Sequence, residues 1–468
     1  GDLFGHRRGL DGELRIRLDR LRIGLRRLRQ ARRKLMREGE VPWFHYQSHF
    51  ADVFARGGFD VVLGNPPWLR SEAIPSEVRR QLIGRYHWWR AQRRSYGNCP
   101  DLSVAFLERA LELAAPGGLV AMLVPAKLTS AGYAAVARHA LASTTKLHAI
   151  ADLTGCTNAE FNATVYPLAL ITSKTAPPRG HRVRTVLSPV RDGGVRQSEL
   201  RGGGPWLLVR SGIRRVVAGL ERHHPRLGET VTCHLGLKTG LNRIFLNPPD
   251  GLEPEALRWA VRGRDLKPFR CQCRVRLLWT HDALGRPSYH VPARARAYLE
   301  SHDAELRARR DFQGGPPWML FRARPAAARY RVVWADLARQ LTAVALTTRR
   351  DLERIALNSC YVAPMTSAAK ADALAAWLNS TWLRSTARLG AVPASGGFAR
   401  FNAQVVARLP LPDSALTDPT LARLARAARA GEGIQAELDD RVAIHLGLSS
   451  SAQNALRAAV DRTAGDSR

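Results

Sequence analysis

The sequence is short of cysteine, of acidic side chains and of long apolar runs. Six cysteines are scattered over 468 residues, and only Cys271 and Cys273 stand close together, which excludes a disulfide framework. Structural zinc normally uses knuckles of Cys-x2-4-Cys spacing, so we expect reduced thiols and no metal. No run of about 18 to 20 apolar residues is present, and no signal peptide is visible. We therefore expect a cytoplasmic protein.

The deficit of acidic residues leaves a strongly basic chain. Lys and Arg number 72 against 40 Asp and Glu, which gives a formal charge of +32. Such an excess predicts a polyanionic partner, and nucleic acid fits better than a membrane surface because the basic residues are spread over the whole chain. A coding bias toward Arg and Ala is the alternative explanation. The length and the 45% apolar content are sufficient for two or three domains.

The first segment, residues 1–42, is predicted to be a basic amphipathic helix. Its leucines recur at spacings of three, four and seven among Arg and Lys, at Leu14, Leu18, Leu21, Leu25, Leu28 and Leu35. This spacing places the leucines on one stripe. The charged face is either simply solvated or lies along phosphates.

Residues 43–180 alternate between apolar runs and helical patterns. The run Phe59 to Gly64 is predicted to be a strand buried on both faces, as in a parallel sheet covered by helices. A helix over residues 101–118 is expected to be capped by Asp101 or Ser103 and to end at Pro-Gly-Gly. Further strands are expected over 119–125, 147–153 and 164–174, with a helix around 130–143. This order is typical of a doubly wound α/β fold, which binds ligands beyond the carboxyl ends of its strands.

The alternation stops near residue 180. The Gly-rich stretch from Gly193 to Pro205 is predicted to be a linker or an exposed loop. Residues 181–412 have less regular patterns and many arginines, which favours an α+β region, and residues 413–468 are predicted to be helical.

The first strand runs directly into Asn65-Pro66-Pro67-Trp68. An exocyclic amine of a base is a poor nucleophile because its lone pair is delocalised, and two acceptors placed out of the ring plane would favour the transition state for its methylation. The side-chain oxygen of Asn65 and the carbonyl of Pro66 can be these acceptors, while the prolines make the turn rigid. The ring of Trp68 offers a surface on which an extruded base can stack. A second Asn-Pro-Pro at Asn247 is followed by Asp250, so the tripeptide without strand and aromatic carries no such prediction.

The stretch FDVVLGNPPW resembles the catalytic motif of amino-methyltransferases. Its flanks, HFADVFARGG before it, and DLSVAFLERALELAAPGGLVAMLVPAKL and FNATVYPLAL after it, are similar to gamma-group adenine-N6 DNA methyltransferases, especially Type IIG restriction-modification proteins. Four later stretches, LKTGLNRIFL, VRGRDLKPF, AAWLNSTWLR and FNAQVVARLPLP, are similar to the target-recognition region of that family. The resemblance covers most of residues 43–450.

The resemblance implies a partial Rossmann-like methyltransferase domain, an α+β target-recognition domain and a helical C-terminal segment. It implies methyl transfer from S-adenosylmethionine to a flipped-out adenine in double-stranded DNA, as part of restriction-modification or another phage-defence system. Catalysis then falls to Asn65, Pro66, Pro67 and Trp68, and Phe161 becomes the second wall of the base pocket. The candidate cofactor contacts are Asp52 and Asp60, and the candidate DNA contacts are Lys238, Arg262 and Arg264.

A glycine-rich turn for the methyl donor is missing from the pattern. No strand followed by Gly-x-Gly precedes Asn65, and the glycines at Gly202 to Gly204, Gly236 and Gly240 follow no apolar strand. We therefore expect the donor site to belong to a lost N-terminal half or to a partner subunit. The chain by itself is then expected to bind DNA in a salt-sensitive way without methylating it.

Three alternatives remain open. Pro249-Asp250 with Asp265-Leu266-Lys267 is a loose form of a nuclease pattern that binds Mg²⁺ through carboxylates, although no alternating hairpin carries it. The same Asn-Pro-Pro-aromatic turn also occurs in enzymes that methylate RNA bases or a protein glutamine. A non-catalytic DNA-binding or specificity subunit is the third possibility.

Overall fold

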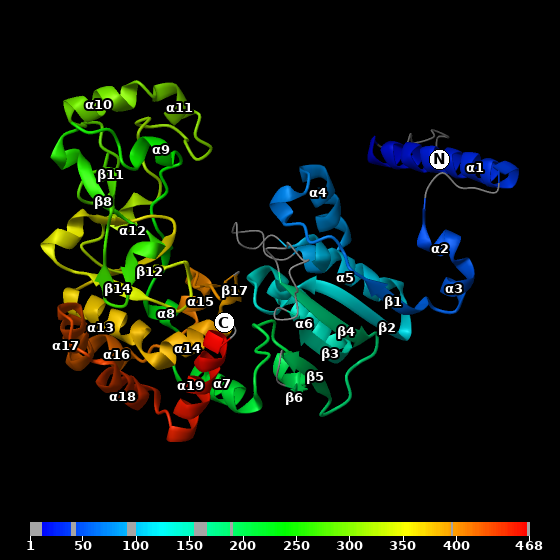
Figure 1. Cartoon of the computed structure of the whole chain (residues 1–468). Coiled ribbons are helices and arrows are strands. Elements are labelled where there is room, and N and C mark those ends of the chain that lie inside the picture. The colour runs from blue at the N-terminus through cyan, green and yellow to red at the C-terminus, as the bar shows by residue number, and fades with distance from the viewer. Residues whose placement is uncertain are drawn as a thin grey trace, which may run out of the picture.

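The computed structural model describes residues 12–38, 44–90, 100–153, 166–187, 191–394 and 396–465. It has a mixed α/β fold in which a six-stranded sheet is followed by a larger part built from several small sheets and many helices (Figure 1). In these described ranges, no helix is both long and apolar enough to cross a membrane.

The six-stranded sheet has the order β1-β2-β4-β3-β5-β6. Parallel pairs join β1 to β2 and β3 to β5, whereas β4 runs antiparallel to both of its neighbours. The carboxyl ends of β1, β2 and β3 consequently lie at the same edge. The strands are β1 Phe59–Gly64, β2 Ala114–Pro125, β3 Lys146–Asp152, β4 Pro167–Ser173, β5 Arg182–Leu187 and β6 Arg191–Arg196.

Two helices pack on this sheet through one apolar core. Helix α5 (Leu102–Leu113) contacts β1 and β2, and α6 (Ala135–Thr144) contacts β3. The predicted cap is confirmed, because a side-chain oxygen of Asp101 accepts a hydrogen bond from the Ser103 N–H at 3.0 Å. The core is formed by Val104, Leu107, Val120, Val124, Leu141, Leu147, Ile150, Leu168 and Leu170.

Burial on both faces was the wrong prediction for β1. In this strand the side chain of Val61 is 58% exposed and that of Leu63 is 81% exposed, while Val62 packs against the core. The strand lies at the end of the sheet and pairs on one side with β2. The face that carries Val61 and Leu63 is left exposed. An apolar run predicts a strand, but burial depends on what packs against it.

The helix expected over 101–118 ends earlier, at Leu113. Residues 114–118 instead begin the long strand β2, and Pro116 and Gly117 are exposed there. A Cβ at Gly118 would lie 2.8 Å from the carbonyl oxygen of Phe59, so only glycine allows β1 to approach this closely. The Pro-Gly-Gly stretch therefore marks an irregular start of a strand and not a helix end.

The sheet also continues past residue 180, where a domain boundary was predicted. Strands β5 and β6 belong to it, and β6 occupies the start of the stretch predicted to be a linker. The fully buried Arg138 of α6 then donates hydrogen bonds to the carbonyl oxygens of Gly203 and Gly204 at 2.8 Å each. The Gly-rich loop is therefore fastened to the first part of the chain.

The second part of the chain contains two larger sheets and a layer of helices. Its four-stranded sheet has the order β14-β12-β16-β7, and its three-stranded sheet has the order β11-β8-β15. Their strands are β7 His234–Leu235, β8 Leu257–Val261, β11 Val275–Leu278, β12 Tyr330–Ala335, β14 Ala343–Leu346, β15 Arg354–Ala356 and β16 Cys360–Met365. The longer helices are α7 Ser211–His223, α13 Ala368–Asn379, α14 Thr381–Gly390, α17 Pro419–Ala430, α18 Gln435–Leu446 and α19 Ser450–Gly465.

Tryptophans hold the helical layer to the four-stranded sheet. Trp334, Trp377 and Trp382 are fully buried in one core. Each indole N–H donates to a backbone carbonyl, at 2.8 Å to Phe401, 2.9 Å to Pro410 and 2.7 Å to Asp439 respectively. The predicted helical nature of residues 413–468 is confirmed for the described residues, and α19 packs against α7 and α14.

Helix α1 (Gly12–Glu38) confirms the amphipathic helix predicted at the N-terminal end. It lies outside both parts in Figure 1. Its apolar stripe is largely exposed, since Leu21 is 65% and Leu28 is 64% accessible.

Candidate functional site

The turn after β1 presents Asn65 at the carboxyl end of the sheet. Asn65 and Pro67 are exposed, whereas Pro66 is buried. The Trp68 indole Nε1 donates a hydrogen bond to the carbonyl oxygen of Leu123 in β2 at 3.2 Å. The ring is half-buried and its orientation is fixed from the neighbouring strand. The four residues of the predicted motif are therefore brought together by one short turn.

The chain after the turn is fastened to the start of α5. The Leu102 N–H donates to the carbonyl of Leu69 at 2.9 Å, and Arg70 forms a β-bridge with Asp101. The turn is thus held on one side by β2 and on the other by the capping residue of α5. Tertiary contacts, in addition to the prolines, keep the acceptors of Asn65 and Pro66 in place.

The same edge of the sheet receives the ends of two further strands. Pro125 at the end of β2 lies opposite Pro167 at the start of β4, and Asp152 at the end of β3 lies opposite Leu168. Phe161, the predicted second wall of the base pocket, falls outside the described residues. The described chain on either side of it nevertheless meets the edge that carries Asn65.

A group of charged residues at this edge was missed by the sequence analysis. Burial lowers the pKa of Lys127, and the positive charges of Arg70 and Arg400 lower it further. Burial raises the pKa of Asp101, while its bonds to Ser103 and the charge of Lys127 oppose that rise. Lys127 lies two residues beyond the end of β2, so the rule that ligands bind at carboxyl ends could have identified it. Arg400 could not be identified, because only the folded chain brings it here.

Arg400 shows that the second part of the chain reaches the site. It lies in the two-residue strand β18 (Ala399–Arg400) and forms an ion pair with Asp336, whose pKa is raised by burial. Arg388 of α14 is close enough to Tyr166 for the two to interact electrostatically. Both parts therefore contribute cations near the edge that carries Asn65, which would suit a polyanion lying between them.

The two candidate cofactor residues are not enclosed. Asp52 lies in the short helix α3 (Ala51–Ala55), where its exposed carboxylate faces Arg56 at 3.8 Å, and Asp60 is exposed on β1. Gly57 and Gly58 adopt positive φ but precede β1, at the end of the strand opposite to Asn65. Neither candidate residue therefore lies in a cradle that could enclose S-adenosylmethionine.

The three candidate DNA contacts have different surroundings. Lys238 forms an ion pair with Asp311. The guanidinium of Arg262 donates two hydrogen bonds to the Asp265 carboxylate, at 3.0 and 2.9 Å. Arg264, in the same turn, is exposed. Arg262 therefore supports the turn from within, while Arg264 is presented to solvent.

The nuclease pattern does not assemble into a metal site. The carboxylate of Asp265 is occupied with the backbone and side chain of Arg262, and Asp250 is exposed in a turn. Among the residues that the structure describes, no three His, Cys, Asp or Glu side chains are grouped so that they could hold a metal ion.

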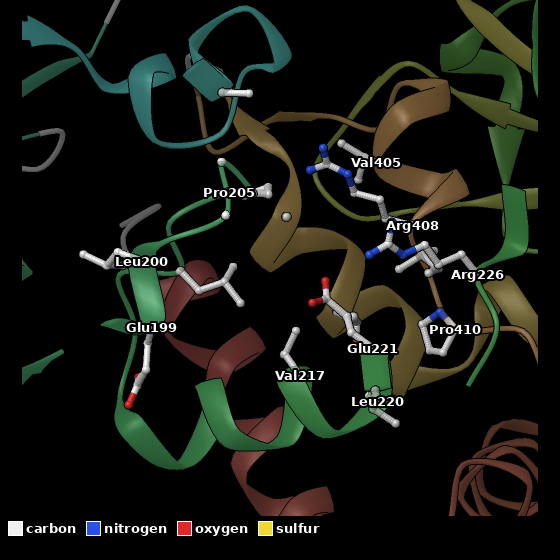
Figure 2. A pocket seen from close by; sticks show the side chains of 18 of the residues that line it. Glu199, Leu200, Pro205, Val217, Leu220, Glu221, Arg226, Val405, Arg408 and Pro410 are labelled. Carbon is white, nitrogen blue, oxygen red and sulfur yellow. The ribbon is translucent and has the colours of Figure 1, made fainter. Parts of the chain in front are cut away.

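A cavity of about 470 Å³ lies between the Gly-rich loop and the helices α7, α14 and α15 (Ala403–Ala407) (Figure 2). Arg408 and Glu221 line it, and burial lowers the pKa of Arg408. None of Asn65, Trp68 and Lys127 lines this cavity. It belongs to the junction between the two parts and not to the turn after β1.

Comparison with known proteins defines the class of the first part. Residues 17–158 match the model of the Eco57I restriction-modification methylase family. The match contains the Asn65 to Trp68 turn, Asp52, Asp60 and Lys127. Phe161 and the candidate DNA contacts lie beyond it.

Individual relatives extend the similarity to most of the chain. The Type II methyltransferase M.XhoI of Xanthomonas vasicola is 25% identical over 422 residues, which covers 80% of this chain and 72% of that protein. The Type II methyltransferase M.BstVI of Geobacillus stearothermophilus is 26% identical over 242 residues, covering 45% and 42% respectively. The chain thus aligns with less than half the length of M.BstVI.

The fold is also that of a solved enzyme. The Type IIL restriction-modification enzyme MmeI, determined in complex with DNA, superposes with a TM-score of 0.55. The superposition covers 87% of this chain and 54% of that chain, at 13% sequence identity. This likeness includes both the six-stranded sheet and the second part, and it concerns the fold alone.

Proposed function

We propose that the protein acts as a site-specific DNA methyltransferase, which transfers a methyl group from S-adenosylmethionine to N6 of a flipped-out adenine. The biological setting would be restriction-modification or another phage-defence system. One observation carries the proposal: an exposed Asn65, held in a fixed Asn-Pro-Pro-Trp turn at the carboxyl end of β1, inside a stretch that matches the restriction-modification methylase family. The test is the appearance of N6-methyladenine at one sequence motif in the DNA of cells that express the protein together with the polypeptide that completes its donor site.

The geometry suggests a role for each residue of the turn. The amide oxygen of Asn65 and the carbonyl of Pro66 accept the two N–H groups of the adenine amine as its nitrogen becomes tetrahedral. Trp68 stacks on the extruded base, and its bond to Leu123 means that little side-chain freedom is lost when the base arrives. Phe161 is proposed as the opposite wall. The donor supplies an electrophilic methyl group when it is bound.

The cations around the turn fit the flanking phosphates. Lys127, Arg70 and Arg400 approach one another closely enough to lower the pKa of Lys127. A phosphate group between them would relieve this repulsion and position the strand from which the base is extruded. Arg264 is proposed as a further DNA contact, and Lys238 and Arg262 as contacts that would first have to exchange an acidic partner.

The unpaired edge and exposed face of β1 favour a partner polypeptide that completes the binding site for S-adenosylmethionine. Val61 and Leu63 are exposed on one face of β1, and Leu119, Ala121 and Leu123 of β2, on the same face, are partly exposed. A row of unpaired backbone groups beside an apolar face is a template for an additional strand. We propose that a second polypeptide segment adds a parallel strand to β1 and carries the glycine turn for S-adenosylmethionine. The basic helix α1 favours acidic surface on that segment.

Calorimetry of S-adenosylmethionine binding tests whether the chain needs this partner to bind the donor. The purified chain is expected to show no stoichiometric binding of S-adenosylmethionine, whereas its complex with the partner binds one equivalent. Leu63→Asp should prevent the complex without changing the melting temperature of the chain, because the side chain it replaces is 81% exposed. Leu284→Asp is the matched control, since Leu284 is 62% exposed in the second part of the chain. Tight binding of the donor by the chain alone would contradict the proposal.

The affinity for each substrate and its dependence on salt distinguish DNA from RNA and protein substrates. The charge of +32 leads us to expect duplex DNA to bind more tightly than structured RNA or a protein substrate. With six to ten phosphate contacts, affinity should fall by about 10³- to 10⁵-fold between 50 and 200 mM salt. Arg264→Ala should reduce the slope of log affinity against log salt by about one. Fluorescence anisotropy measures both effects, and Arg423→Ala, which removes an exposed partner of Glu437, serves as the control.

Other outcomes point to the remaining candidates. Tighter binding of RNA or of a protein, followed by its methylation, would support an RNA or protein-glutamine methyltransferase. Salt-sensitive DNA binding without methylation, even in the presence of a donor-binding partner, would support a non-catalytic DNA-binding or specificity subunit. The second part of the chain, with its own cores and exposed arginines, fits DNA recognition in either case.

A further inference from the structure

Two thiols face each other in the second part of the chain. The Sγ atoms of Cys271 and Cys273 lie 3.3 Å apart, and both side chains are partly exposed. Residues two apart in an extended chain project to the same side, which explains the approach. Cys271 lies in β10 (Arg270–Cys271), paired with β9 (Leu266–Lys267). The two thiols are therefore neighbours that solvent can reach.

The other described cysteines have different environments. Cys360 is fully buried and its Sγ lies 3.6 Å from the carbonyl oxygen of Val261. Burial raises the pKa of Cys233 to about 12, so its thiolate is scarce at neutral pH. Neither has another thiol within hydrogen-bonding distance in the described part of the chain. Among the cysteines that the structure describes, Cys271 and Cys273 are thus the two whose thiols lie close together.

The charges around the pair distinguish its two members. The hydrogen bond from Cys271 lowers the pKa of Cys273, and the guanidinium groups of Arg354 and Arg262 lower it further, although burial and Asp265 act in the opposite direction. The same hydrogen bond and burial raise the pKa of Cys271. The two thiols share one hydrogen bond, and the nearby guanidinium groups favour ionisation at Cys273.

The segment is held firmly on both sides of this pair. The Gln272 N–H donates to the carbonyl of Asp265 at 2.9 Å, and β9 and β10 pair through Leu266 and Cys271. A disulfide needs the sulfur atoms at about 2.05 Å. The sulfur atoms lie 3.3 Å apart and have to approach further for the bond to form. No third metal-ligating side chain joins the pair among the described residues, which favours redox chemistry over metal binding.

We propose that Cys271 and Cys273 form a redox-active dithiol, which hydrogen peroxide oxidises to an intramolecular disulfide. The Cys273 thiolate attacks one peroxide oxygen, the O–O bond breaks, and the second oxygen leaves as hydroxide. Cys271 then attacks the sulfur of the resulting sulfenic acid, and its proton leaves with the hydroxyl group as water. Once the hydroxide is protonated, two thiols have reduced one peroxide to two waters. A thiol such as glutathione restores the reduced form by exchange.

Mass spectrometry tests the disulfide in the unmodified full chain. Reduced protein is treated with about one equivalent of hydrogen peroxide, alkylated with iodoacetamide and digested with chymotrypsin. The peptide that follows Phe269 should lose two hydrogen masses and remain unalkylated, whereas prior reduction should give a doubly alkylated peptide. Two alkylated thiols after peroxide treatment, or a sulfinic acid at either position, would overturn the proposal.

Single substitutions test the assigned roles. In Cys271→Ser, Cys273 should stop at the sulfenic acid, which dimedone traps. In Cys273→Ser, Cys271 should react with peroxide at least about tenfold more slowly, since burial still raises its pKa. Cys233→Ser is the control and should form the disulfide at the wild-type rate. Equal dimedone labelling of both variants would overturn the assignment of Cys273 as the attacking thiol, and circular dichroism melts show whether each variant is folded.

Discussion

Asn65→Ala is expected to abolish adenine methylation while DNA binding stays within about twofold of the wild-type value. Loss of one positioned hydrogen-bonding group of a transition state typically costs about 10²- to 10³-fold in rate. The side chain is exposed, so its truncation removes no packing from the core. Sequencing of native DNA from cells that express the variant together with the donor-site partner measures the methylation, and anisotropy measures the binding. The combination separates chemistry from recognition.

The chain supplies its own control for this substitution. Asn247 begins the second Asn-Pro-Pro, has a positive φ of 48° and accepts a hydrogen bond from the Arg276 N–H at 2.9 Å. Asn247→Ala should therefore lower stability slightly and leave methylation unchanged. If Asn65→Ala methylates normally, the acceptor role is wrong. If both variants lose methylation together with DNA binding, the effect is one of folding.

The turn could be predicted from sequence because its determinants are local. A β-branched run, an amide, two prolines and a tryptophan are adjacent in the chain, and Asp101 caps α5 through a residue two positions away. The packing that fixes Trp68 against Leu123 was not predictable, since it depends on the register between β1 and β2. The approach of Arg400 to Lys127 depends on how the two parts pack, which no local pattern contains.

The sequence-based predictions were wrong where contacts between distant segments determine the structure. The apolar run from Phe59 to Gly64 predicts a buried strand. Leu63 is nevertheless exposed, because no described element covers the face of β1 on which it lies. The stretch from Pro116 to Gly118 predicts the end of a helix. Helix α5 already ends at Leu113, and these residues belong to β2. In the second part, several strands have only two residues, such as β7, β9 (Leu266–Lys267) and β18. Such strands are too short to show any periodicity.

Arg138→Ala is expected to cause a large loss of stability, lowering the free energy of unfolding by about 2 to 5 kcal/mol, as for other large-to-small substitutions in a core. Arg138 is fully buried in α6. Its guanidinium also donates to Leu128 and Ala131, at 2.7 and 2.8 Å, in addition to the loop carbonyls of Gly203 and Gly204. Burial lowers the pKa of Arg138 to about 10, so the group is charged at neutral pH and the carbonyls satisfy that charge. Removal leaves buried acceptors without donors and a cavity in place of the side chain.

Two further variants and a second measurement show whether Arg138 holds the Gly-rich loop in place or only fills the core. Arg138→Lys should also destabilise the protein, because an ammonium group cannot reach four carbonyls in the way that a planar guanidinium does. His139→Ala, next to it on the exposed side of α6, should change stability by less than about 0.5 kcal/mol. Urea unfolding measures these differences. Under native conditions, trypsin should cut after Arg201 faster in Arg138→Ala than in His139→Ala, because the loop has lost its fastening to the sheet. Equal cleavage of the two variants would mean that Arg138 supports the core alone and does not hold the Gly-rich loop.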